Sequence, residues 1–328
     1  MTAHIKTLLS ILTASVCLTS LLTGCQSAPA PAMEGHYTLQ AQSVQVNGTI
    51  INITDWPGSS VTISAVDDET VTVSIDSLLL GFDTLTVSAT AAGEGKDKYT
   101  FSGTYSGQDR DISVSGTVDG SALSLSITDT CTSPVTGRWT VARGEDALAD
   151  ISITYSSPAV TEIEVGGGIT LPVETAVELM NELVRQNLTT TLDNLDYIEL
   201  DRTGYLNISW KGDISTELEP LLTGVVQYWP APDDSWIHLY LRRTITDAVG
   251  SPVSPIDFAL AYSIDGSGSP VLEINQDTFA PWTGVLILAL SSMDESTAPI
   301  AAILKEIAQS LTLPETAFSI SVNLSPVQ

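Results

Sequence analysis

A long stretch of strict alternation constrains the fold of this chain more than any other feature. Between His36 and Val141, aliphatic residues recur at every second position and alternate mainly with serine and threonine. The clearest runs are VTISA from Val61, VTVSID from Val71, LTVSA from Leu85, ISVSG from Ile112 and LSLSIT from Leu123. Successive side chains of a strand point to opposite faces of a sheet, so each run predicts a strand with one buried and one polar face. We therefore expect this part of the chain to be all β.

Turn residues divide the alternating stretch into about eight strands. They are Asn47-Gly48, Asp67-Asp68, Gly93-Glu94-Gly95 and Asp119-Gly120. SGTYSG from Ser102 and SGTVDG from Ser115 repeat in form, as strands that run into tight turns do. The pattern predicts an antiparallel meander in a barrel or sandwich, and an eight-stranded barrel either fills its interior or holds one small ligand. The side chains expected to face such a ligand are Val71, Val73, Ile75, Leu85 and Val87.

Three segments of this stretch resemble a known family. They are Gly35-His36-Tyr37-Thr38, VSIDSLLLGFDTLTVSA from Val73, and ISVSGTVDGSALSLSIT from Ile112. Residues 35–143 are similar in these segments to the calycin-like β-barrel domain of lipoproteins from Gram-negative anaerobes. The resemblance implies a closed antiparallel barrel for this domain. That family has no assigned biochemical activity, so the resemblance implies a fold and not a reaction.

A different pattern begins after the expected junction, which lies around residues 143–157. Apolar residues at steps of three and four predict one amphipathic helix over 172–188 and a second over 299–311. Strand-like runs such as YIELD, YLNISW, WIHLYLRR, DFALAYSI and FSISVNL lie between and after them. Residues 151–328 are therefore predicted to form an α+β domain, with both helices on one face of an antiparallel sheet. The order of elements is loosely similar to that of tubular lipid-binding (BPI-like) modules.

The first twenty-four residues have the composition of an export signal. His4 and Lys6 precede an apolar run from Leu8 to Leu22, and Thr23-Gly24 precedes Cys25. This arrangement is typical of a cleaved secretory signal and not of a transmembrane span. The ending Leu22-Thr23-Gly24-Cys25 resembles the lipobox of bacterial lipoproteins, which implies removal of residues 1–24 and acylation of Cys25. The alternative is a plain signal peptide cut elsewhere, with Cys25 left free.

Acylation of Cys25 would anchor the protein in the bacterial cell envelope. Several acyl chains give stable attachment, whereas a single chain binds only reversibly. Residues 25–34 are rich in proline and alanine and are expected to form an extended tether to the first domain. The segment from Gln26 to Ala30 has no acidic residue, which favours the periplasmic face of the outer membrane over the cell surface.

Charge and cysteine content exclude several classes of partner and cross-link. The formal net charge is −27, so the surface repels nucleic acid phosphates and anionic lipid headgroups. The three cysteines are Cys17, Cys25 and Cys131. Signal cleavage and acylation leave Cys131 alone, so no disulfide within the chain is expected. No cation neighbours Cys131 in the sequence, which indicates an inert thiol.

The sequence contains no recognisable catalytic or metal-binding motif. Outside the leader it has only His36 and His238, and ordinary zinc sites need more histidine and cysteine ligands than this. His238 alternates with apolar residues and is expected on the polar face of a strand. Asp67-Asp68-Glu69 and Asp233-Asp234 fit solvated turns better than a calcium loop. We expect a protein that is not an enzyme and uses no cofactor or metal; a glycosidase-type carboxylate pair stays open.

An aromatic and acidic segment is the most distinctive feature of the second half. In YWPAPDDSW, Trp229 and Trp236 flank a rigid loop that could contact a glycan or a partner protein, or could pair across a hairpin for stability. Arg242 is expected either to meet an anion or to pair with Glu199 and Asp201 across a sheet.

These observations lead to one expectation and one alternative. The expected protein is a membrane-anchored lipoprotein that binds an apolar or amphiphilic ligand without catalysis. The alternative is a structural or interaction lipoprotein that binds an envelope protein or a glycan through Trp229 and Trp236. Neither involves nucleic acid.

Overall fold

The computed structural model describes residues 28–164, 169–212, 224–231, 235–248, 250–251, 253–279, 283, 298–311, 313 and 315–327. The predicted signal peptide, Cys25, and the acidic pair at 233–234 lie outside these residues. The chain separates into two compact units, and each is described by itself. The first contains residues up to Tyr105 together with Ile112–Thr128, and the second contains Ser106–Asp111 and the chain from Asp129 onward.

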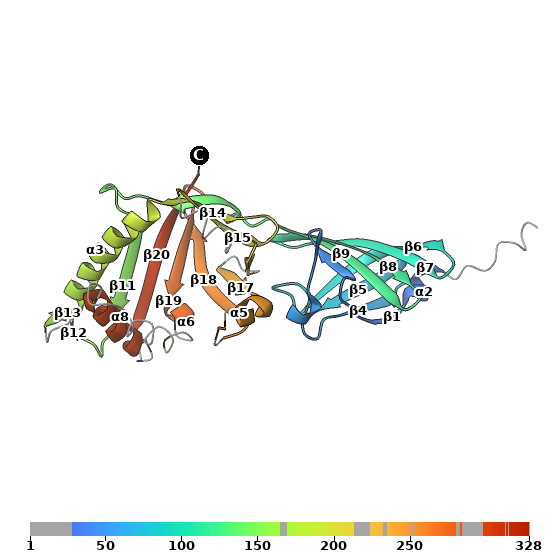
Figure 1. The fold of residues 1–328 in the computed structure, drawn as a ribbon, viewed down its shortest axis with the longest axis horizontal. Helices are drawn as coiled ribbons and strands as arrows, with labels where there is room; N and C mark the ends of the chain where they lie inside the picture. Colours follow the sequence, from blue (N-terminus) through green and yellow to red (C-terminus); the bar gives the residue numbers. More distant parts are fainter. Residues whose placement is uncertain are drawn as a thin grey trace, which may run out of the picture. The chain divides into compact units, whose positions relative to one another are not determined.

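The fold is mainly β, as the alternation predicted. Strands account for 51% of the structure and helices for 18%. Two nine-stranded sheets carry the architecture, and a two-stranded ribbon accompanies the second (Figure 1). No helix in the described part of the chain is long and apolar enough to cross a membrane.

The first sheet is a curled meander. Its strands are β1 (Gly35–Thr38), β2 (Val44–Val46), β3 (Thr49–Ile50), β4 (Ser60–Ala65), β5 (Thr70–Asp76), β6 (Thr84–Gly95), β7 (Lys98–Ser106), β8 (Arg110–Asp119) and β9 (Ala122–Cys131). They lie in the order β1-β4-β5-β6-β7-β8-β9-β2-β3, and β2 pairs with β9 in parallel. The meander from β4 to β9 agrees with the turn spacing. The pairings of the described residues do not join the two edge strands β1 and β3, although the chain crosses from one edge of the sheet to the other between β1 and β2.

The interior of the first unit is filled by its own side chains. Burial alternates along β5 and β6, and the expected ligand-facing residues Val71, Val73, Ile75, Leu85 and Val87 are each 0–1% exposed. They pack in one apolar cluster that also includes residues of β4, β7, β8 and β9. Contact of these five residues with a ligand stays a prediction.

The tether is not extended throughout, which corrects the expectation for residues 25–34. Pro29–Met33 forms the short helix α2, with proline in its first turn. Proline is compatible with that position because its missing N–H has no partner there in any helix. Ala30 and Met33 are fully buried in the cluster of the first unit, so burial of apolar side chains holds this segment in place.

The second sheet closes on itself. Its strands are β10 (Gly137–Val141), β11 (Ile151–Ser156), β14 (Leu195–Leu200), β15 (Tyr205–Trp210), β16 (Val226–Pro230), β17 (Trp236–Leu241), β18 (Ile256–Ile264), β19 (Pro270–Asn275) and β20 (Ala317–Pro326). Their order is β10-β14-β15-β16-β17-β18-β19-β20-β11, and a further pairing of β10 with β20 closes an eight-stranded antiparallel ring. β11 continues along β20 beyond β10. The sequence assigned β10 to the N-terminal barrel, whereas its pairing places it here.

Two helices pack beside β11 and β20. They are α3 (Val173–Leu192) and α8 (Ala298–Ser310), close to the predicted 172–188 and 299–311. Ala176 and Met180 of α3 meet Ile303 of α8 in a cluster that includes Ile153 and Phe318. Ile153 and Phe318 lie on one face of the sheet, so the expectation that both helices share a face is confirmed. The shorter elements are η1 (Ile53–Asp55), β12 (Glu162–Glu164), β13 (Thr170–Pro172), α5 (Arg243–Ala248) and α6 (Gln276–Phe279).

Helix α3 also covers the edge of β11 that faces away from β20. The Ile153 N–H donates to Asn181 Oδ1 at 2.7 Å, and Asn181 Nδ2 donates to the Ile153 carbonyl at 2.8 Å. One and two turns further along α3, Arg185 Nε donates to the Ala149 carbonyl at 3.1 Å, and Thr189 Oγ1 accepts from the Ala149 N–H at 2.8 Å. Spacing by four places these three side chains on one stripe of the helix, which takes the place of a neighbouring strand.

Candidate functional site

The inner face of the closed ring is a continuous apolar surface. The strand registers place Leu206 opposite Val226, Tyr228 opposite Leu239, and Leu239 opposite Phe258. The same face continues through the pairs Tyr262–Leu272 and Leu272–Val322. Because side chains alternate along each strand, one set of apolar residues passes from strand to strand around the ring.

Much of this inner face is only half-buried. The half-buried residues include Ile198, Leu206, Ile208, Trp210, Val226, Leu239, Leu241, Ile256, Phe258, Leu272, Ile274, Ile320 and Val322. Several of them pack at the margins of the two smaller clusters of the second unit. The matching residues of the first unit are buried almost completely. The packing of the second unit therefore covers these apolar side chains only in part.

A buried polar group lies at one part of this face. The Tyr228 hydroxyl donates to the Asp201 carbonyl at 2.7 Å, and Thr136 Oγ1 lies 3.5 Å from the same hydroxyl. Thr136 also donates to Cys131 Sγ at 3.3 Å. Burial is the main cause that raises the pKa of Tyr228, so the phenol is neutral at physiological pH and acts as a donor. Cys131 is free and 5% exposed, which agrees with the inert thiol expected.

Trp229 does not pair with Trp236, and the expected cross-strand tryptophan pair is wrong. Trp229 lies opposite His238 and stacks on its ring, with centroids 4.4 Å apart and planes at 14°. His238 Nδ1 lies 3.0 Å from Asp257 Oδ1. Trp236 is opposite Ala231 instead, because the register of β16 and β17 aligns Pro230 with Ile237. Both tryptophans are half-buried, and their contact with a partner or a glycan stays a prediction.

The expected pairing of Arg242 with Glu199 is also wrong. Glu199 accepts from Arg138 Nε at 2.8 Å, and the Arg138 guanidinium lies 4.5 Å from the centre of the Tyr197 ring. Arg242 Nη2 donates instead to the Gly224 carbonyl at 3.5 Å. The reason is the strand order, because β15 and β16 separate β14 from β17.

The aspartate side chains in two acidic turns accept hydrogen bonds from backbone N–H groups. Asp67 Oδ1 accepts from the N–H groups of Glu69 and Thr70 at 2.9 and 2.7 Å, and the hydrogen bond from Glu69 is the main cause that lowers the pKa of Asp67. Asp265 accepts from Ser267 and Ser269 in the same way, as expected for a turn. Among the described residues, no three histidine, cysteine or acidic side chains come close enough to hold a metal ion.

Comparison with known proteins adds no homologue to this description. No family model matches the chain, and neither do any of the curated proteins or solved structures compared with it. The fold and the inner face of the ring therefore carry the functional argument. The sequence did contain a signal for that face, since WIHLYLRR, DFALAYSI and VLEIN alternate, but alternation by itself does not distinguish a filled interior from an uncovered one.

Proposed function

We propose that the protein is a non-catalytic binding protein for an apolar or amphiphilic ligand, and that the ligand is held by the inner face of the closed ring. The observation that carries this proposal is the half-buried state of apolar residues such as Leu239, Phe258 and Leu272 inside a closed sheet. Covering apolar surface is favourable by about 25 cal/mol per Å². A ligand with an aliphatic portion would therefore gain free energy at this face.

The filled interior of the first unit supports assigning the ligand to the second. Val73 and Val87 are opposite one another in β5 and β6 and are 0–1% exposed, so their apolar surface is already covered. A new ligand there would have to displace close-packed side chains, which costs contacts already made. The ring offers apolar surface without that cost.

Replacing Leu239 with glutamine should weaken binding of a neutral hydrophobic probe, N-phenyl-1-naphthylamine, by about tenfold. The change removes apolar area from the inner face, and about 1.4 kcal/mol corresponds to a factor of ten in affinity. Val271→Gln is the matched control, because Val271 is also a half-buried aliphatic residue of a strand but lies on the opposite face. Fluorescence titration of the delipidated protein measures both.

Equal effects of the two substitutions would contradict the assignment to the inner face. Native mass spectrometry gives an independent check, since protein purified without a delipidation step should keep a lipid-sized adduct. A chain that retains no adduct and binds no probe would remove the proposed function.

The proposal includes attachment to the outer membrane through Cys25, with the periplasmic face favoured. The resemblance of Leu22-Thr23-Gly24-Cys25 to a lipobox supports it. Expression in a bacterium fed an alkyne-labelled palmitate should label the protein, and Cys25→Ser should abolish the label. A labelled Cys25→Ser variant would contradict acylation at this residue.

A further inference from the structure

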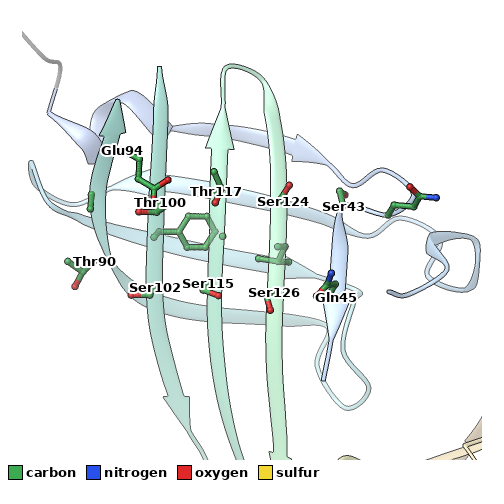
Figure 2. Close-up of a pocket in the computed structure, with 15 residues that line it drawn as sticks. Ser43, Gln45, Thr90, Glu94, Thr100, Ser102, Ser115, Thr117, Ser124 and Ser126 are labelled. Carbon is green, nitrogen blue, oxygen red and sulfur yellow. The ribbon is translucent and has the colours of Figure 1, made fainter. Parts of the chain in front are cut away.

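The polar face of the first sheet holds a groove that the proposed function does not use. The groove has a volume of about 590 Å³ and is lined by residues of β6, β7, β8, β9 and β2. This volume falls within the range of roughly 300–1,000 Å³ found for small-molecule sites. Figure 2 shows the lining side chains on adjacent strands of the sheet.

Hydroxyl groups form a regular grid in this groove. Thr100 and Ser102 come from β7, Ser115 and Thr117 from β8, and Ser124 and Ser126 from β9 (Figure 2). Neighbouring strands are about 4.8 Å apart, and side chains on one face recur about every 6.7 Å along a strand. The sheet therefore fixes the spacing of these hydroxyl groups, because serine and threonine side chains are short.

These hydroxyl groups are not used by the protein itself. In residues 28–164, which the structure describes without a gap, none of the six has an intramolecular hydrogen bond. Elsewhere on the same polar face, Ser60 and Thr84 donate to Asp76 at 3.1 and 2.7 Å. The grid therefore keeps both its donors and its acceptors available to a ligand.

The groove is close to neutral although the chain carries a net charge of −27. Glu94 is the one charged residue in its lining, and the Glu94 carboxylate pairs with Lys98 at 2.9 Å. Phe101 is its one aromatic residue and is only 2% exposed. A charged ligand would find no opposite charge here, and an apolar ligand would leave the hydroxyl groups without partners.

We propose that this groove binds a segment of a neutral glycan. Sugar hydroxyls donate and accept hydrogen bonds as serine and threonine hydroxyls do. Each sugar hydroxyl can therefore act as donor or as acceptor towards the hydroxyl groups of the grid. The grid supplies many such contacts without a stacking aromatic ring, which gives a weak site suited to a repeating chain with several contacts. This site is separate from the apolar face of the ring and does not depend on it.

The test is a titration of the ¹⁵N-labelled protein with maltohexaose, cellohexaose and chitohexaose, followed by amide chemical shifts. At least one oligosaccharide should shift amides of β7, β8 and β9. Thr117→Val and Ser115→Ala should each weaken binding by about fivefold, since each removes one hydrogen bond. Thr72→Val is the matched control, because Thr72 is also half-buried on the polar face, in β5, but does not line the groove.

Three results would overturn the proposal. They are the absence of shifts at the highest soluble concentration of every oligosaccharide, equal weakening by Thr117→Val and Thr72→Val, and tighter binding of an anionic chain such as polygalacturonate. Binding of N-phenyl-1-naphthylamine should be unchanged in Thr117→Val, so failure of the glycan site and failure of the apolar site are separate outcomes.

Discussion

Replacing Gly116 with alanine is expected to destabilise the first unit by about 2 kcal/mol, as overpacking of a filled core does. A Cβ at this position would lie 2.3 Å from Phe101 Cζ and 2.9 Å from the Ser124 carbonyl oxygen. Neither atom can move away freely, because the Phe101 ring is 2% exposed and the carbonyl belongs to β9. Native-state hydrogen exchange at amides of β7 and β8 reports the stability of this unit apart from the second.

Gly35→Ala is the matched control for this prediction. Its Cβ would meet Tyr37 at 3.5 Å, which is ordinary van der Waals contact, so little change in stability is expected. Phe101→Leu should relieve part of the clash, and the double variant should then lose less than the sum of the two single changes. Equal stability of Gly116→Ala and Gly35→Ala would show that the core adapts to the added carbon.

Replacing Asn181 with alanine should destabilise the second unit by about 2–3 kcal/mol. The Asn181 amide satisfies both the N–H and the carbonyl of Ile153 at the edge of β11 that faces away from β20. Ile153 is 4% exposed, so water replaces these bonds poorly once the amide is gone. A buried backbone group without a partner costs about 1–3 kcal/mol. Exchange at amides of β11 and β20 in urea measures the loss.

Asn187→Ala provides the control on the same helix. Asn187 is exposed and its Nδ2 donates to the Leu183 carbonyl within α3, so the change has the same effect on helix propensity without touching β11. An open edge also invites pairing with a second chain, so Asn181→Ala should associate more readily in sedimentation experiments. If Asn181→Ala and Asn187→Ala lose the same stability and associate to the same extent, α3 does not protect the edge of β11.

The local pattern of the sequence predicted the elements well where burial repeats with a fixed period. Val71, Val73 and Ile75 alternate with polar residues, and all three are buried in β5 as predicted. Apolar residues spaced three and four apart from Val173 onward predicted helix α3, in which Met180 is fully buried. These predictions depend on one strand or one helix at a time, and the side-chain period of an element follows from its backbone geometry alone.

The local pattern of the sequence did not predict the register between strands or the closure of the second sheet. The stacking of Trp229 on His238 depends on how β16 aligns with β17, and several alignments satisfy the same alternation. Ring closure depends on Trp139 meeting Pro326, a pairing between residues far apart in the sequence. The first sheet is therefore curled where a barrel was expected, and the antiparallel sheet expected for the second domain closes into a ring.

The two candidate sites also combine features that the sequence predicts with features that only the tertiary structure decides. The sequence alone determined which residues of each strand are apolar and which are polar, because that depends only on residue type and the two-residue period. It therefore determined that Leu239 lies on the apolar face of its own strand, that Phe258 does so in another strand, and that Ser115 and Thr117 share the polar face of one strand. Only the tertiary structure decided that the first set is left half-buried inside a closed ring and that the second lines a groove, because cover and concavity arise from how several strands curve together.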